Sequence, residues 1–450
     1  MSLVDELRSS LGPDASILHD PAVTLSYSRD QSQLAPNGIP LCVLLAKSED
    51  EISRTLAFAN QRKIPVVARG AGSGLSGGAN ALSNSIVISL EKMNRIIEID
   101  TVNQIARVDP GVINLDLDKA VSKFGLAYLP DPASREWSTI GGNVATNAGG
   151  MCCIKYGVTS NHIRALRLVL PDGEILSLGN RLKKSVANLD LLHLIIGSEG
   201  TLGIISEVTV SLSPRPKPAT TMIATFSSID TAMLAVPELV GLGPSMLEVV
   251  DETTLRAVQE WKPLGLDGVG AVLLMQSDET PEKCEAGVEI SLKHGAIEAT
   301  FSDDPRDSAD LLLIRKLAYP ALERKGAALL DDVCVPISEI SNLVREINKI
   351  AQESELLIGI FGHAGDGNMH PTIVYDHNDE NASQRALSAF KKIVESAQNL
   401  GGTASGEHGI GSIKTDFVQN ESGNRIVNLQ REIKNIFDPL GILNPGKKIP

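Results

Sequence analysis

The feature that most constrains the fold of this chain is a glycine-rich stretch at residues 70–78, in which five of the nine residues are glycine. It follows a β-α-β pattern: an apolar run at 41–46, a helical period at 48–63 and a second apolar run at 64–68. The helix is expected to start with the Ser-x-x-Glu capping pattern. A glycine loop directly after such a unit predicts a close approach of the backbone to a ligand.

The residues GSGLSG at 72–77 match the dinucleotide-binding pattern G-x-G-x-x-G, and Glu91 follows Gly72 by nineteen positions. In a Rossmann fold this loop opens a helix, whose N-terminus receives the pyrophosphate. Here the next residues are rich in Gly, Asn and Ser and lead into an apolar run at 85–90. The loop is therefore expected to join strand to strand, which argues against a Rossmann fold. Its bare N–H groups can still form a nest for an anion; the alternative is a plain glycine-rich turn.

The rest of the first half shows strand and turn patterns. Strands are predicted at 85–90 and 95–100, and 104–112 continues the sheet. An irregular stretch rich in Gly, Pro, Asn and Thr follows at 129–150. Later segments predict a hairpin at 165–178 with a Pro-Asp-Gly turn, a glycine turn into a strand at 197–212, and a proline-rich linker at 213–219.

Beyond this linker, strand-like runs alternate with helical patterns, which predicts an α+β domain with an open sheet. The strand-like runs lie at 221–226, 245–250, 270–275, 297–301 and 328–333. The helical patterns lie at 228–240, 252–260, 280–294, 307–325, 337–353 and 381–400.

The stretch HAGDGNMH places His363 and His370 on either side of a turn made of Gly, Asp and Asn. Helix formation is excluded by the intervening residues, and on one continuous strand the two side chains would face opposite ways. A hairpin removes this conflict, because its two arms bring both imidazoles back together. Glu407 in GEHGIG, next to His408, would add a carboxylate, and two histidines with a glutamate and an open position form the ligand set of a catalytic divalent-metal site. A polar turn without metal is the alternative.

Length and composition narrow the class of protein. A chain of 450 residues predicts two domains, or two and a cap. The formal charge of −14 argues against general nucleic-acid binding, and an anionic substrate would need a locally positive pocket. No run approaches a membrane span, and the N-terminus lacks a signal-peptide pattern, so a cytoplasmic protein is expected. Neither zinc nor iron–sulfur spacing is present among Cys42, Cys152, Cys153, Cys284 and Cys334.

Several long motifs make a family resemblance specific. PVVARGAGSGLSGGA, LPDPASREWSTIGGNVATNAGG, KYGVTSNHIRALRLVLPDGEIL and GSEGTLGIISEVTV occur in this order. They resemble the FAD domain of the vanillyl-alcohol-oxidase/PCMH-type flavoproteins. FGHAGDGNMHP, GEHGIG and GILNPGK resemble the C-terminal half of the D-2-hydroxyacid dehydrogenase branch of that family. The resemblance covers the chain from about residue 36 to the end.

The resemblance implies an α+β fold. A PCMH-type FAD-binding domain of two α+β subdomains is followed by an α+β substrate domain with an open antiparallel sheet and a C-terminal cap. The implied division is an N-terminal segment at 1–35, the FAD domain at 36–214, the substrate domain at 215–400 and a C-terminal segment at 401–450 that returns to the flavin.

The resemblance also implies the residues that contact FAD. The first glycine loop wraps the pyrophosphate, a second segment lies along the flavin, and further residues sit nearby. The first set is Arg69, Gly70, Ala71, Gly72, Ser73, Gly74, Leu75, Gly77 and Gly78; the second is Pro130, Asp131, Pro132, Ser134, Thr139, Gly141, Gly142, Asn143, Thr146, Asn147 and Gly149; the third is Glu199, Gly200, Gly203, Ile205 and Asn444. Some relatives bind FAD covalently through a histidine in the first loop; here that loop has Ser73 and no histidine, so dissociable FAD is expected.

For the chemistry, the resemblance assigns His363, His370 and Glu407 as ligands of a divalent metal, expected to be Zn or Mn, and His408 as the base. The alternative for His408 is a third nitrogen ligand or a residue that orients Glu407. Arg315 matches the arginine that clamps the substrate carboxylate, where bidentate pairing favours Arg over Lys; the alternative is a solvated helix arginine. Tyr319 and Lys414 match residues near the substrate.

The implied reaction is the oxidation of glycolate or D-lactate by an FAD-dependent D-2-hydroxyacid dehydrogenase. No basic pair after Arg315 suits a second carboxylate, which disfavours D-2-hydroxyglutarate. Without iron–sulfur cysteines, the electron acceptor is expected to be a quinone, a cytochrome or partner subunits, as in a glycolate oxidase complex, which would also bring the protein to the inner membrane. The alternatives are a non-catalytic flavin-binding subunit and a flavoenzyme with other chemistry.

Overall fold

The computed structural model describes residues 2–450, and the chain divides into two compact units. Unit 1 comprises Met1–Gly150, Val158–Arg215 and Glu407–Pro450; unit 2 comprises Met151–Gly157 and Pro216–Gly406. The proline-rich linker thus contains a passage from one unit to the other. The first 35 residues belong to unit 1, where their β1 pairs with β2. No helix among the described residues is long and apolar enough to span a membrane.

The first sheet of unit 1 confirms the β-α-β pattern. Its strand order is β1 (Ile17–Leu18), β2 (Cys42–Leu45), β4 (Ile86–Ser89) and β3 (Val66–Arg69). β4 is parallel to its two neighbours, β2 and β3. Helix α3 (Glu49–Arg62) connects β2 to β3 and is capped by Ser48, whose side chain accepts from the Glu51 amide. The glycine loop runs from β3 to β4 without a helix, which confirms that the loop is not of the Rossmann type.

A second, antiparallel sheet completes the core of unit 1. Its order is β5 (Ile96–Asp100), β6 (Ile105–Val108), β10 (Ile204–Ser211), β8 (Ile163–Val169) and β9 (Ile175–Gly179). β5 and β6 pair with each other and not with β4, so the chain changes sheets after Ser89. The expected hairpin at 165–178 is confirmed by the pairing of β8 with β9.

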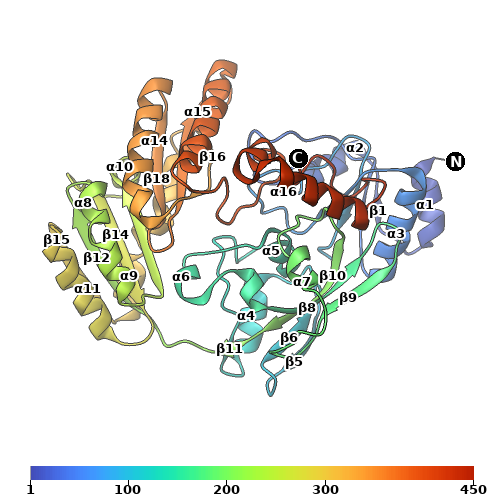
Figure 1. The fold of residues 1–450 in the computed structure, drawn as a ribbon, viewed down its shortest axis with the longest axis horizontal. Helices are drawn as coiled ribbons and strands as arrows, with labels where there is room; N and C mark the ends of the chain where they lie inside the picture. The colour runs from blue at the N-terminus through green and yellow to red at the C-terminus, as the bar shows by residue number, and fades with distance from the viewer. Residues whose placement is uncertain (1) are drawn as a thin grey trace. The chain divides into compact units, whose positions relative to one another are not determined.

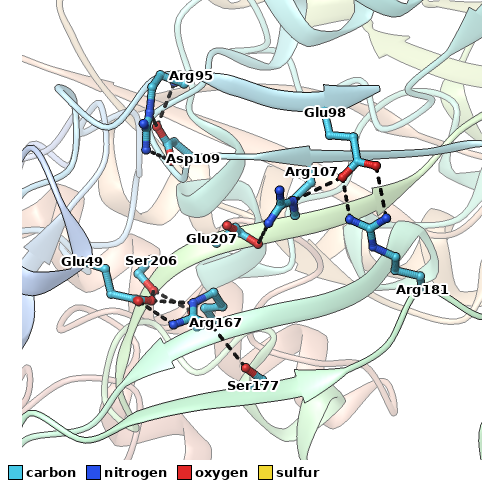
Figure 2. Close-up of polar contacts among 10 residues, drawn as sticks. All are labelled: Glu49, Arg95, Glu98, Arg107, Asp109, Arg167, Ser177, Arg181, Ser206 and Glu207. Carbon is cyan, nitrogen blue, oxygen red and sulfur yellow. Dashed lines mark hydrogen bonds and ion pairs between the residues drawn. The ribbon is translucent and has the colours of Figure 1, made fainter. Parts of the chain in front are cut away.

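One face of this second sheet carries paired charges (Figure 2). Arg107 contacts Glu98 on β5 and Glu207 on β10, each at 3.5 Å. Arg167 on β8 pairs at 2.6 Å with Glu49, the first residue of α3, which also accepts a hydrogen bond from Ser206. The contacts of Glu49 therefore connect helix α3, which joins two strands of the first sheet, to one face of the second sheet.

The stretch at 129–150, expected to be irregular, contains a helix. Thr139 caps α5 (Ile140–Thr146) by accepting from the amide of Gly142 at 3.2 Å. The two glycines lower helix propensity, but packing requires at least one of them: a Cβ at Gly141 would lie 2.5 Å from Pro110 Cβ. The prediction of an irregular segment was wrong because the contact with Pro110 is a tertiary contact, which the local sequence pattern does not contain.

The other elements of unit 1 are short, apart from one helix. They are α1 (Leu3–Leu11), α2 (Pro21–Thr24), η1 (Leu25–Tyr27), α4 (Asn114–Ser122), β7 (Leu126–Ala127), η2 (Thr159–His162), α7 (Leu191–Ile195), β11 (Ser213–Pro214) and α16 (Thr415–Phe437). The sequence pattern did not predict α16. It is drawn in red in Figure 1 and contains a non-helical residue, Gly423, with φ 74°.

Unit 2 is built on an open sheet whose named strand pairs are all antiparallel, as expected. Its order is β15 (Glu298–Ser302), β12 (Thr220–Phe226), β14 (Ala271–Ser277), β13 (Met246–Asp251), β18 (Leu357–His363), β19 (Asn368–Tyr375) and β16 (Ala327–Leu330), and β17 (Val333–Cys334) also pairs with β19. The strand-like runs predicted at 221–226, 245–250, 270–275 and 297–301 are confirmed, whereas the run at 328–333 is divided between β16 and β17.

Helices cover this sheet. They are α6 (Cys153–Tyr156), α8 (Ile229–Met233), α9 (Val236–Gly241), α10 (Glu252–Trp261), α11 (Pro281–Lys293), α12 (Pro305–Leu311), α13 (Leu313–Glu323), η3 (Ile337–Glu339), α14 (Ile340–Ser354) and α15 (Glu380–Asn399). Figure 1 shows α14 and α15 side by side. α10 and α13 pack on the face that carries Val250, Val272 and Phe361, and α11 packs on the opposite face, over Met222 and Met275.

Candidate active site

The glycine loop presents a run of unused backbone donors. Among the described residues, no N–H group from Gly70 to Ala79 donates to a protein acceptor. Gly72 and Gly77 have φ of 77° and 80°, and a Cβ at Gly72 would lie 2.1 Å from the guanidinium of Arg69. Glycine is therefore required for the loop to close on this arginine, and the bare amides form a cradle suited to an anionic group.

A buried cation and a buried anion flank this loop. Arg69, the last residue of β3, has an Nη1 atom without a hydrogen-bond partner in the described chain. Burial lowers the pKa of Arg69, and the charge of Asp30 opposes that shift. Asp30, which the sequence analysis missed, has an unpartnered Oδ2 atom, 3.2 Å from where a Cβ on Gly74 would lie. A donor and an acceptor without protein partners fit a phosphate-bearing cofactor with hydroxyl groups.

The second predicted cofactor segment lies against the first. A Cβ on Gly70 would lie 2.4 Å from Oγ1 of Thr139, the cap of α5. Asn114 was not predicted, yet its Nδ2 donates at 3.2 Å both to the carbonyl of Pro130 and to Oδ1 of Asn143. Asn114 thus fixes the amide of Asn143 and leaves Nδ2 of Asn143 as its remaining donor.

Glu199 fixes the loop that contains Glu407 and His408. Its Oε1 accepts from the Ile410 amide at 2.8 Å, and its Oε2 accepts from the Gly411 amide at 2.7 Å. Both carboxylate oxygens of Glu199, a predicted cofactor residue, therefore accept hydrogen bonds from backbone amides of the protein.

Ser76 joins the same loop to the glycine loop. Its hydroxyl donates to the carbonyl of His408 at 3.1 Å, and its own carbonyl accepts from the Ser412 amide at 3.0 Å. In unit 1 the structure thus brings the predicted base, His408, onto the predicted cofactor loop. The His408 Nε2 atom lies 3.6 Å from the Glu407 carboxylate.

In unit 2 the hairpin forms as expected. β18 ends at His363 and β19 contains His370, which pairs in register with Phe361, so both histidines lie on the face covered by α13. Their Nε2 atoms are 3.2 Å apart and both side chains are buried. Nδ1 of His363 lies 2.5 Å from Oε1 of Glu248 on β13.

Glu248, which the sequence analysis also missed, connects the hairpin to Arg315. Its other oxygen accepts from Arg315 Nε at 2.5 Å, and the guanidinium lies 4.6 Å from the ring of Phe361. Burial alone would raise the pKa of this fully buried carboxyl, but the charges of His363 and Arg315 outweigh burial and hold it below its usual value. A glutamate inside the apolar run MLEVVD was the signal available in the sequence.

Asp332 takes a similar position on the other side of the hairpin. Its Oδ1 accepts from Asn368 Nδ2 at 2.7 Å and lies 3.9 Å from Nδ1 of His370. Its Oδ2 accepts from the Ser405 hydroxyl at 2.7 Å. Each histidine thus has an acidic group near its Nδ1 atom, the arrangement that orients imidazoles as metal ligands.

The two other predicted substrate residues lie in different units. Tyr319, on α13, is near Glu323 (3.5 Å), and burial raises the pKa of its hydroxyl to about 12. Lys414 is buried in unit 1, where its amide donates to the Ile410 carbonyl at 3.1 Å. The hairpin histidines and Arg315 are therefore brought together in unit 2, and Lys414 lies beside the loop of His408 in unit 1.

Comparisons with known proteins identify the family of the chain. Residues 40–179 match the FAD binding domain family, and residues 215–448 match the family of FAD linked oxidases, C-terminal domain. The chain is 40% identical to the glycolate oxidase subunit GlcD of Bacillus subtilis (strain 168), over 94% of this chain and 92% of that protein. It is 35% identical to a D-lactate dehydrogenase of Anaerostipes hadrus, over 96% and 94%.

Among solved structures, p-cresol methylhydroxylase with bound substrate has the same fold. Its TM-score is 0.80 at 17% sequence identity, over 99% of this chain and 96% of that one. This likeness confirms the PCMH-type fold, and the two family matches together cover most of the chain. The chain is an oxidoreductase of the FAD-linked oxidase family, with a PCMH-type FAD-binding domain.

Proposed function

We propose that this protein is a D-2-hydroxyacid dehydrogenase that uses FAD to oxidise glycolate or D-lactate to the 2-oxoacid. The observation that carries the proposal is the pair of buried imidazoles in unit 2, whose Nε2 atoms are 3.2 Å apart and whose Nδ1 atoms lie near acidic groups. The names of the relatives, glycolate oxidase subunit and D-lactate dehydrogenase, support the same substrates.

The imidazole pair fits a divalent metal. The two Nε2 atoms are close enough, at 3.2 Å, that both could bind one ion, and imidazole nitrogen is a preferred ligand of such ions. We infer that His363, His370 and Glu407 would hold Zn²⁺ or Mn²⁺, which would supply a Lewis acid for the substrate hydroxyl. Glu248 contacts Nδ1 of His363 at 2.5 Å, which would direct Nε2 of His363 toward the ion, and Asp332 lies 3.9 Å from Nδ1 of His370.

Chain connectivity supports Glu407 as the third ligand. The residue before it, Gly406, packs so closely on Asn368 of the hairpin that a Cβ there would lie 2.4 Å from the side-chain nitrogen. Ser405 donates to Asp332, and Thr403 pairs with Cys334. Glu407 is therefore attached directly to a segment that is fixed on the hairpin, about 3.8 Å along the backbone from Gly406.

The remaining steps are assigned to two groups of this chain and to the cofactor. His408 takes the proton of the substrate hydroxyl, because an imidazole titrates near neutral pH. Arg315 binds the substrate carboxylate with the guanidinium nitrogens that its bond to Glu248 leaves available. FAD, which would be held without a covalent bond because the first loop has Ser73 and no histidine, would supply the acceptor of the hydride.

The electron acceptor beyond the flavin is assigned to partner subunits, a quinone or a cytochrome. The name glycolate oxidase subunit, carried by a relative, supports an assembly with partner subunits. We propose that the protein is cytoplasmic and reaches the inner membrane through those partners. A non-catalytic flavin subunit is disfavoured, because such a subunit has no need for the buried imidazole pair.

The test is anaerobic bleaching of the bound flavin by glycolate, D-lactate, L-lactate and D-2-hydroxyglutarate, each with a matched buffer control. Rapid bleaching by glycolate or D-lactate, and slow bleaching by the other two acids, is the expected result. Preferred bleaching by D-2-hydroxyglutarate would overturn the substrate assignment. A flavin that none of the four acids reduces would favour the non-catalytic subunit.

A further inference from the structure

The C-terminal tail of the chain is fixed beside the glycine loop in unit 1. The Asp438 carboxylate accepts from the amides of Ile442 and Leu443, at 3.1 and 2.7 Å. Val66 of β3 donates to the Ile442 carbonyl and accepts from the Asn444 amide, both at 2.8 Å. The tail thus extends the first sheet at β3, the strand that leads directly into the glycine loop.

Two tail side chains hold the far end of that loop. Asn444 Nδ2 donates to the carbonyls of Gly78 at 2.9 Å and of Glu199 at 2.7 Å. Nζ of Lys447 donates to the Gly78 carbonyl at 3.1 Å and to the Asn80 carbonyl. The Gly78 carbonyl therefore accepts two hydrogen bonds from the tail.

Lys447 is a buried cation, with 2% of its surface exposed. Burial lowers its pKa to about 8, against the opposing charges of Asp30 and Glu199. Taking an ammonium group out of water is costly, and an uncharged amide would suffice to hold two carbonyls. The buried ammonium group of Lys447 lies next to a run of unpaired backbone N–H groups, and this arrangement points to an anionic ligand.

We propose that Lys447 is a positioning residue for the cofactor, which holds the glycine loop in its anion-binding conformation and whose charge favours the pyrophosphate of FAD. The inference rests on the FAD-binding domain and not on the proposed substrate or metal. Lys447 acts through the carbonyls of Gly78 and Asn80, so its loss would weaken binding of the phosphate-bearing half of FAD more than binding of the flavin half.

The test compares three variants of the full chain as apoprotein. Lys447→Met removes the charge and keeps the length, Lys447→Arg keeps the charge, and Lys123→Met removes an exposed charge elsewhere in unit 1, at the end of α4. Each is titrated with FAD, with ADP as the pyrophosphate-bearing half and with riboflavin as the flavin half. Thermal unfolding of each apoprotein checks the fold.

We expect Lys447→Met to bind FAD and ADP at least tenfold more weakly and riboflavin with unchanged affinity, with partial recovery in Lys447→Arg and little effect of Lys123→Met. Unchanged FAD and ADP binding would overturn the proposal. Equal losses for ADP and riboflavin would also overturn it, because they would indicate a general structural role.

A pH series on the unaltered protein keeps the proposal testable if Lys447→Met does not fold. The charged groups that face Lys447 are Asp30, Glu199 and, through Glu199, Lys448. Because the ligand favours the protonated amine, FAD affinity should fall as the pH rises from about 7 to about 9. Lys447→Arg, whose charge does not titrate there, should show a flat profile. A fall of the same size in Lys447→Arg would contradict the inference.

Discussion

At the scale of single residues, Glu248 joins the groups that we assign to the metal and to the substrate. One oxygen contacts His363 and the other contacts Arg315, and the carboxylate is fully buried. This shared anion balances the buried charge of Arg315 and contacts Nδ1 of His363, so the two side chains belong to one cluster. The contact with Glu248 fixes the orientation of the Arg315 guanidinium, so that its remaining N–H groups are available to the carboxylate of a substrate.

Removing the charge of Glu248 should therefore weaken metal binding. For Glu248→Gln we expect a loss of about 10–100-fold in affinity for Zn²⁺ or Mn²⁺, the usual cost of changing a residue that orients a ligand. Titration of the metal-free protein measures it. Glu252→Gln, an exposed charge removal four residues later on α10, is the matched control. Equal affinities in Glu248→Gln and the control would contradict the assignment.

Arg315 should contribute to substrate binding through its planar guanidinium. Lysine cannot bind both Glu248 and a carboxylate in the same way, so Arg315→Lys should raise the KM for glycolate or D-lactate at least tenfold, or about 1.5–3 kcal/mol. Steady-state kinetics at fixed metal concentration test this. Arg324→Lys at the end of the same helix, where Arg324 stacks on Trp261, should leave KM unchanged. If both variants kept the original KM, Arg315 would be an ordinary helix arginine.

At the scale of elements, α5 shows how packing overrides local preference. Its glycines suggest a loop, yet the residues form a helix because Thr139 caps it and Gly141 fits against Pro110. The same segment supports Asn143 and the start of the glycine loop. The close packing of this glycine-containing helix therefore brings its N-terminus against the predicted cofactor loop.

Substituting Gly141 should be costly for that reason. Gly141→Ala is expected to destabilise unit 1 by about 1–3 kcal/mol, because the new methyl overlaps Pro110, and to release FAD at a lower temperature. Gly241→Ala, at the end of α9, meets no atom within 4 Å and should be neutral or slightly stabilising. Thermal unfolding followed by flavin fluorescence compares the midpoint temperatures of the two variants. Equal midpoints would argue against the packing explanation.

The N-cap of α10 provides a test of buried charge. Burial raises the pKa of Asp251 to about 6, although its Oδ1 accepts from the amides of Thr254 and Ile360. An acid whose pKa is higher in the folded state makes stability fall as the pH rises from about 4 to about 6. Asp251→Asn keeps the cap and should remove that part of the slope. The thermal midpoint at pH values across this window measures it, and an unchanged slope would contradict the shift.

At the scale of the whole molecule, the chain passes between its two units at Gly150, Gly157, Arg215 and Gly406. The short excursion at 151–157 is held in unit 2 by Lys155, which pairs with Asp278 at 2.5 Å and with Glu279 at 2.9 Å. The proposed reaction draws on both units: the cofactor loop and His408 belong to unit 1, and the imidazole pair and Arg315 belong to unit 2.

The sequence predicts much of this molecule because its signals are local. Apolar periodicity locates most strands and helices, and the turn residues between His363 and His370 predict the hairpin. Family resemblance adds the cofactor segments. Residues that act through distant contacts have no such signal: Glu248, Asn114 and Lys447 are recognised only when β13, α4 and the tail are placed against their partners. The helix α16 was missed because its long polar segment shows only a weak apolar pattern.

The most direct test of the account is the metal dependence of flavin reduction. Protein treated with a chelator should hold FAD but be reduced by glycolate or D-lactate far more slowly, and one equivalent of Zn²⁺ or Mn²⁺ should restore the rate. His370→Ala should bind FAD normally and not recover, whereas His377→Ala, an exposed histidine after β19, should behave like the unaltered protein. Reduction that is equally fast without metal and in His370→Ala would contradict the central claim that the buried imidazole pair is part of a catalytic metal site.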